Sequence, residues 1–188
     1  MPFRSTSEQL SERQAARTAG GSDKSAGEHE SAARTIALRL LESRPCTRAE
    51  LERALARRGV PEDAATVVLD RFAEVGLIDD EAFAAAWVSS RHSGRGLGRR
   101  ALGAELRRRG VAEDTVREAV SAVSSDDEEG AARTLARRRL RTMQGLPRET
   151  QVRRLAGMLA RKGFSQGLAI RLAREVAGTA DDGAATAD

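Results

Sequence analysis

The hydrophobic and polar positions of the chain repeat with a period of about fifty residues. One helical pattern occurs three times without insertion or deletion, as Leu51-x-x-x-Leu55-x-Arg57-Arg58-Gly59-Val60, Leu102-x-x-x-Leu106-x-Arg108-Arg109-Gly110-Val111 and Leu155-x-x-x-Leu159-x-Arg161-Lys162-Gly163-Phe164. The three glycines are 51 and 53 residues apart. A unit of this length suits three short helices that share a core with a neighbouring unit.

Each part of the repeated segment has a physical role. Two leucines at i and i+4 lie on one face of a helix, and a basic pair near the end favours the negative end of the helix dipole. Glycine then ends the helix at a position that needs positive φ. Thr47 with Glu50 forms a capping box, Pro61 suits a first helical turn, and Ser165 is a plausible N-cap. The segment therefore predicts the second helix of each unit.

Further apolar stripes predict a helix on either side of each repeated segment. First helices are expected at about 31–43, 80–92 and 127–142, and third helices carry Val68 and Phe72, Ala119 and Val123, and Leu172 and Val176. The sequence thus predicts an all-α protein with three tandem three-helix repeats at 31–77, 78–124 and 125–177, arranged as an elongated, curved array. Residues 1–30 and 178–188 lack a sustained apolar period and are predicted to be disordered tails.

Composition narrows the function. The 188 residues include 32 % charged and only 3 % aromatic side chains, which is typical of exposed amphipathic helices. The single Cys46 and two histidines exclude an internal disulfide and a four-ligand zinc site of the usual kind. No signal peptide or long apolar run is evident. We expect a cytoplasmic monomer that does not enter a membrane and needs no metal or cofactor.

Acidic clusters do not indicate catalysis. Asp79-Asp80-Glu81 and Asp126-Asp127-Glu128-Glu129 both occur where a first helix is predicted to begin, and acidic residues there complement the helix dipole. An exposed cap also offers no cause for the shifted pKa that an acid catalyst needs. Cys46 is interpreted as a small packed thiol. No catalytic residue is predicted.

The glycine-rich stretch Gly94-Arg95-Gly96-Leu97-Gly98-Arg99 has two readings. It lacks the Gly-Lys-Ser/Thr ending of a phosphate-binding loop, and no strand precedes it. A milder hypothesis is that its backbone N–H groups, with Arg95, Arg99 and Arg100, hold a phosphate or carboxylate. The alternative is a flexible loop between helices.

Charge is unevenly distributed. Residues 34–177 carry 28 basic and 20 acidic side chains, a net charge of +8, so this part of the chain should attract polyanions. The second helices are basic, whereas the third helices of the first two repeats are acidic and almost lack Asn and Gln, which disfavours sequence-specific DNA reading. The alternative is a merely solvated charged face. The candidate contact residues are Arg57, Arg58, Arg95, Arg99, Arg100, Arg107, Arg108, Arg109, Arg153 and Arg154.

Two further motifs stand in the middle of the chain: Gly76-Leu77-Ile78-Asp79-Asp80-Glu81-Ala82-Phe83-Ala84 and Gly98-Arg99-Arg100-Ala101-Leu102-x-x-Glu105-Leu106-x-x-x-Gly110-Val111. Together with the threefold repeat, they resemble the RecX regulatory proteins over about residues 34–177. The resemblance implies a non-enzymatic modulator, mainly an inhibitor, of RecA. Such a protein binds the RecA filament on DNA and limits its ATPase, its extension and strand exchange in recombination and SOS repair. Weak nonspecific DNA binding is a further expectation. The alternatives are a free-standing nonspecific nucleic-acid-binding repeat protein and a structural helical adaptor.

Overall fold

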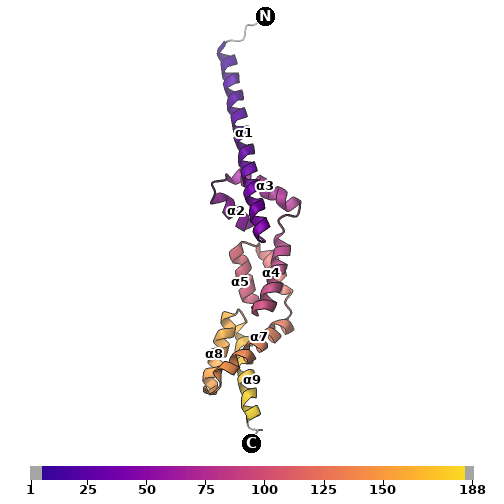
Figure 1. Cartoon of the computed structure of the whole chain (residues 1–188), viewed down its shortest axis with the longest axis vertical. Coiled ribbons are helices and arrows are strands. Elements are labelled where there is room, and N and C mark those ends of the chain that lie inside the picture. Colours follow the sequence, from indigo (N-terminus) through magenta and orange to yellow (C-terminus); the bar gives the residue numbers. More distant parts are fainter. Residues whose placement is uncertain (1–5, 185–188) are drawn as a thin grey trace. The chain divides into compact units, whose positions relative to one another are not determined.

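A computed structural model describes the backbone of residues 6–184 and the side chains of residues 25–178. Within the described residues the chain forms nine α-helices and one short 3-10 helix, with no strand. It divides into two compact units, Met1–Asp79 and Asp80–Asp188, which Figure 1 shows in indigo to magenta and in magenta to yellow. The predicted all-α class is confirmed.

The first unit is a three-helix bundle of α1 (Thr6–Ser43), α2 (Arg48–Ala56) and α3 (Glu62–Glu74). Its core contains Leu51 and Leu55 of α2 and Leu69 of α3, all fully buried. The hydroxyl of Thr47 accepts a hydrogen bond from the Glu50 backbone N–H, as the predicted cap requires.

The second unit contains two three-helix bundles. The first consists of α4 (Asp80–Arg95), α5 (Arg99–Arg109) and α6 (Glu113–Ser121), around the buried Leu102 and Leu106. The second consists of α7 (Ser125–Leu140), the 3-10 helix η1 (Arg141–Met143), α8 (Arg148–Arg161) and α9 (Gln166–Ala184). Leu155 and Leu159 are fully buried there, and α8 packs along α9 (Figure 1).

The second helix of every repeat ends in the same way. Gly59, Gly110 and Gly163 have φ values of 75°, 87° and 89°, in the left-handed region. The next residue donates its N–H to the carbonyl of the second repeat leucine in each case: Val60 to Leu55, Val111 to Leu106 and Phe164 to Leu159, all at 3.2 Å. This 6→1 bond is the Schellman helix end, so the predicted stop signal is confirmed in all three repeats.

The two terminal helices extend beyond the apolar stripes that predicted them. The helix α1 begins at Thr6 rather than near residue 31, and α9 continues to Ala184 through most of the predicted C-terminal tail. At the N-terminal end, Ala, Glu, Gln and Arg are frequent and are good helix formers. The parts of the predicted tails at 1–5 and 185–188 lie outside the described residues. The predicted repeat boundaries and the predicted disordered tails stay predictions.

No helix in the described part of the chain has the length and apolar character that a membrane crossing requires. Nor do the described side chains contain a group of three or more His, Cys, Asp or Glu residues that could hold a metal ion.

Candidate interaction surface

Two glycines join the second and third repeats by direct backbone contact. The Gly98 N–H donates to the Lys162 carbonyl at 2.9 Å, and the Arg100 N–H donates to the Gly163 carbonyl at 3.2 Å. A Cβ on Gly163 would lie 2.3 Å from the Ala101 nitrogen, and one on Gly98 would lie 2.7 Å from the Gly163 backbone. The start of α5 therefore packs directly against the end of α8. Only glycine at positions 98 and 163 allows the two backbones to come this close.

The glycine-rich stretch holds a carboxylate, and it belongs to the chain itself. The first free N–H of α5, on Arg99, donates to Oε1 of Glu128 at 3.0 Å. The Arg99 guanidinium donates from Nε to the Val123 carbonyl at 2.8 Å, and this Nε is 3.7 Å from Oε2 of Glu128. The sequence suggested that the Arg99 N–H and guanidinium would hold an external anion. In the structure they instead join α5 to Val123, which precedes α7, and to Glu128 in the first turns of α7.

Two further candidate arginines are also occupied within the middle repeat. Arg107 makes a two-point contact with Glu113 at 2.7 and 2.6 Å, and its hydrogen bonds lower the pKa of that carboxyl. The Arg109 guanidinium lies 3.8 Å from the ring centroid of Trp87, whose Nε1 donates to Glu105 at 2.9 Å. A guanidinium over an indole face is a favourable cation–π arrangement. The acidic third helix that the sequence predicted therefore compensates part of the basic second helix.

The other candidate arginines form fewer bonds within the chain, or none in the described structure. Arg58 donates to the carbonyl of Ala54 in its own helix at 3.2 Å. Among the described residues, six candidates are exposed and have no partner for the guanidinium: Arg57, Arg95, Arg100, Arg108, Arg153 and Arg154. The structure thus separates the ten candidates into a bonded group and a group whose charge faces solvent.

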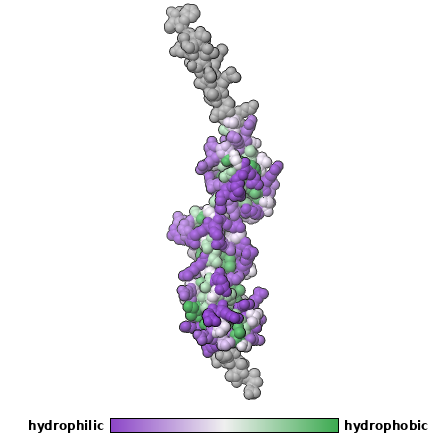
Figure 2. Space-filling view, turned by 90° about the vertical axis from the view of Figure 1, so that its left-hand side faces the viewer, coloured by the Kyte–Doolittle hydropathy of each residue, from purple (hydrophilic) through white to green (hydrophobic). Residues whose placement is uncertain are grey.

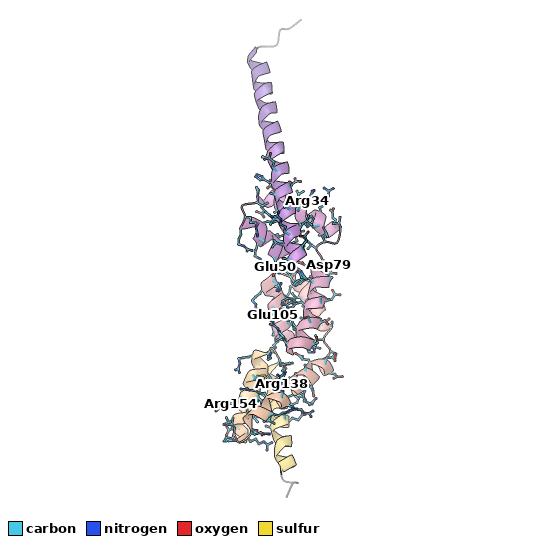
Figure 3. The ribbon with its side chains drawn as sticks, viewed as in Figure 1. Arg34, Glu50, Asp79, Glu105, Arg138 and Arg154 are labelled. Carbon is cyan, nitrogen blue, oxygen red and sulfur yellow. The ribbon has the colours of Figure 1, made fainter. Side chains whose placement is uncertain are left out.

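A second set of exposed cations, absent from the predicted contact residues, lies at the end of α7. Arg137, Arg138, Arg139 and Arg141 are all exposed and carry no partner within the described part of the chain. Figure 3 labels Arg138 on this helix and Arg154 on α8, which packs against it. The available signal was the arginine run itself, because the next acidic residue in the sequence is Glu149. The run does not belong to the threefold pattern, since the first helices of the other two repeats have no such run.

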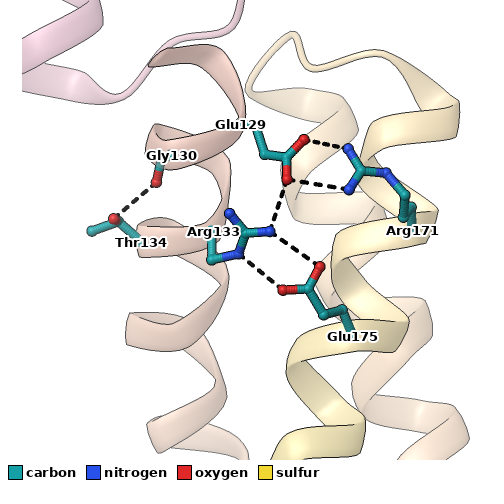
Figure 4. Close-up of polar contacts among 6 residues, drawn as sticks. All are labelled: Glu129, Gly130, Arg133, Thr134, Arg171 and Glu175. Carbon is teal, nitrogen blue, oxygen red and sulfur yellow. Dashed lines mark hydrogen bonds and ion pairs between the residues drawn. The ribbon is translucent and has the colours of Figure 1, made fainter. Parts of the chain in front are cut away.

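Between α7 and α9, by contrast, charges are paired. Arg133 of α7 contacts Glu175 of α9 at 2.9 Å and Glu129 at 2.7 Å, and Arg171 of α9 also binds Glu129 (Figure 4). Hydrogen bonds from Arg171 and Arg133 lower the pKa of Glu129 to about 2. We call these four residues the α7–α9 ion-pair network.

These features define a class. The chain consists of helical repeats with left-handed glycine ends, its acidic clusters lie where helices α4 and α7 start, and many of its arginines are exposed and unpaired in the described structure. Such a protein is built to bind a macromolecule through its surface.

Comparison with known proteins gives the family. Three profiles match in chain order: "RecX, first three-helix domain" at residues 33–72, "RecX, second three-helix domain" at 79–120 and "RecX, third three-helix domain" at 126–172. The chain belongs to the RecX family of regulatory proteins, which are not enzymes. The resemblance inferred from the repeat and the two motifs is confirmed.

Several curated relatives are similar over most of their length. The chain is 62 % identical over 143 residues to the regulatory protein RecX of Thermobifida fusca, covering 76 % of this chain and 77 % of that protein. It is 56 % identical over 143 residues to the Streptomyces coelicolor RecX, covering 76 % of each chain. A crystal structure of RecX from Lactobacillus salivarius has the same fold, with a TM-score of 0.74 at 19 % identity over 80 % of this chain and 97 % of that one.

Proposed function

We propose that this RecX protein binds RecA and its nucleoprotein filament, and that it acts mainly as an inhibitor. The observation that carries the proposal is the match of all three RecX domains, in order, along residues 33–172. The regulated activities are RecA ATP hydrolysis, filament extension and strand exchange in recombination and SOS repair. We propose further that it acts in the cytoplasm, where it would meet RecA, and as a monomer.

The charge of the repeats supports this proposal. A net charge of +8 over residues 34–177 favours encounter with a filament that contains DNA, and the effect accumulates over many weak contacts. Among the candidate contacts, we assign binding to the exposed Arg57, Arg58, Arg95, Arg100, Arg108, Arg153 and Arg154. Arg99, Arg107 and Arg109 are bonded within the chain, so their guanidinium groups already have partners.

The deciding experiment measures RecA ATPase on single-stranded DNA while this protein is titrated in. We expect hydrolysis to fall as the ratio of this protein to RecA rises. Equal hydrolysis at every ratio up to equimolar would overturn the proposal.

The contact assignment is tested with Arg100→Glu and Arg108→Glu together, because both side chains are exposed on α5 and unpaired in the described structure. The matched control is Arg34→Glu with Arg39→Glu, which changes the net charge equally on an exposed part of α1. Weaker ATPase inhibition by the α5 variant than by the control supports the assignment, whereas equal inhibition places the contact elsewhere.

A further inference from the structure

The excess positive charge of the chain is concentrated in one helical hairpin. Residues 137–162 contain nine basic side chains and one acidic side chain, a net charge of +8. The remainder of 34–177 is therefore neutral overall. The stretch corresponds to the end of α7, η1 and α8.

The exposed arginines of this hairpin fall into rows. Arg137 and Arg141 are one helical turn apart, about 6 Å along the helix, and Arg154 and Arg161 are two turns apart, about 10 Å. With Arg138 and Arg153 they form what we call the α7–α8 arginine surface, and all six are exposed. Two helices that pack together thus carry arginines on their solvent sides (Figure 3).

Little within the third repeat compensates this charge. Of its acidic side chains, Glu128 caps α5, and Glu129 and Glu175 belong to the α7–α9 ion-pair network. None of the six arginines has a partner in the described structure. Like charges on successive turns of one helix repel one another, so a bound polyanion would relieve that repulsion.

The chemistry of the surface distinguishes a nucleic acid from a protein partner. Protein interfaces centre on buried aromatic or aliphatic anchors, and the most exposed large apolar side chains described here are Leu38, Val67, Val75 and Leu77, all in the first unit. On the face in Figure 2 the green areas are small and separated by purple. Arginine forks match phosphate oxygens by two-point hydrogen bonds.

We propose that the α7–α8 arginine surface binds the phosphodiester backbone of a nucleic acid. We expect contact with phosphates rather than sequence reading. The Gln151 amide, which could otherwise read a base, is bonded to the carbonyls of Met143 and Leu146 at 3.2 and 3.0 Å. This inference rests on the proposed function. It adds that the third repeat is the part of the chain that contacts the DNA of the RecA filament.

The test uses the full chain and two labelled probes, an oligothymidylate and a DNA duplex, with affinity measured by fluorescence anisotropy at several salt concentrations. The variant is Arg137→Gln, Arg138→Gln and Arg141→Gln; Gln and Arg have similar helix propensities. The control carries the same charge change at exposed, unpaired arginines of the first unit, as Arg34→Gln, Arg39→Gln and Arg71→Gln.

For the single strand we expect the slope of log affinity against log salt to fall by about 2 in the variant, since each phosphate contact contributes roughly 0.7. Affinity at about 0.1 M salt should drop at least about tenfold, with little change in the control. The two probes show whether a flexible strand or a duplex fits the rows better. Should the variant unfold, Arg153→Gln, Arg154→Gln and Arg161→Gln on α8 test the same surface.

Equal losses in variant and control, or no binding of either probe by the parent protein at low salt, would overturn the inference. RecA ATPase, measured in parallel, separates its failure from that of the proposed function. If the parent protein inhibits RecA but the variants bind DNA as tightly as the parent does, only the inference is contradicted. If DNA affinity depends on the hairpin but RecA ATPase is unaffected by the parent protein, only the proposed function is contradicted.

Discussion

At the scale of single residues, two glycines with the same role in the repeat meet different surroundings. Gly59 and Gly163 both end a second helix with positive φ. A Cβ on Gly59 would meet nothing within 4 Å, whereas one on Gly163 would overlap the backbone and Cβ of Ala101. Backbone conformation requires glycine at both positions, and packing requires it additionally at Gly163.

This difference predicts unequal costs for one substitution. Gly59→Ala should destabilise by about 1 kcal/mol, the cost of a left-handed alanine. Gly163→Ala should cost more than about 3 kcal/mol, because α5 must also move away from the end of α8. Urea unfolding followed by circular dichroism measures both.

Trp87, the only tryptophan, lies in the second repeat, so its fluorescence reports whether Gly163→Ala also loosens the bundle across the contact. Equal stabilities of the two alanine variants would mean that α5 does not depend on Gly163.

The sequence was sufficient to predict the left-handed glycines because that requirement is local: a helix stop, a basic pair and an apolar residue stand next to one another. It could not predict the contact between Gly98 and Gly163, since both positions read simply as turn glycines. Nor could it separate Arg99, Arg107 and Arg109 from Arg108. Their partners Val123, Glu113 and Trp87 become neighbours only after the helices pack.

At the scale of helices, the α7–α9 ion-pair network joins two elements by charge as well as by apolar packing. Glu129 is central to it, because it receives hydrogen bonds from Arg133 of its own helix and from Arg171 of α9. Helix positions were predictable from apolar stripes. These pairs were not, because Glu129 also fits the pattern of an acidic first helical turn.

Glu129 predicts a defined response to acid. Its pKa is about 2 in the folded chain, below the ordinary value of 4.5, so the stabilisation it gives is complete above about pH 4.5 and is lost as the pH falls towards 2. Glu129→Gln lacks this contribution. The variant should be less stable than the parent protein at neutral pH, and the difference should shrink between pH 4.5 and 2.

Urea midpoints across this pH range give the measurement. Glu149→Gln is the control, because Glu149 is exposed on α8 and has no ion-pair partner in the described structure. A constant gap between the Glu129 variant and the parent protein down to pH 2 would show that the network does not hold the carboxylate ionised.

At the scale of the whole molecule, the distribution of unpaired charge differs from the expectation. The sequence pointed to the middle repeat, whose second helix has five arginines. The structure neutralises part of that helix with Glu113 and leaves the end of α7 and much of α8 uncompensated. Net charge alone therefore did not locate the most basic surface.

In the middle repeat, two arginines are neutralised by exposed ion pairs that substitutions can remove. Glu113→Lys with Asp114→Lys frees Arg107 and Arg117 from their partners and adds two cations. Binding to the RecA filament on DNA should be kept or strengthened, and more so at low salt. Since the lost ion pairs are exposed, unfolding free energy should change by less than about 1 kcal/mol.

Filament binding at two salt concentrations, with a melting curve for each protein, checks this prediction. Weakened inhibition by a variant that is still folded would mean that the acidic helix α6 itself contacts the partner.

The backbone contact between Gly98 and Gly163 limits how the three copies of the repeat can be exchanged. The repeated segments have similar sequences, yet the end of α8 in the third repeat packs directly against the start of α5 in the second. A chimaera that duplicates, deletes or reorders copies must transfer both glycines together with Ala101, or the junction is lost even if each bundle keeps its own core. The order of the repeats along the chain is therefore part of the structure, and family members that gain or lose a copy should carry compensating changes on both sides of the cut.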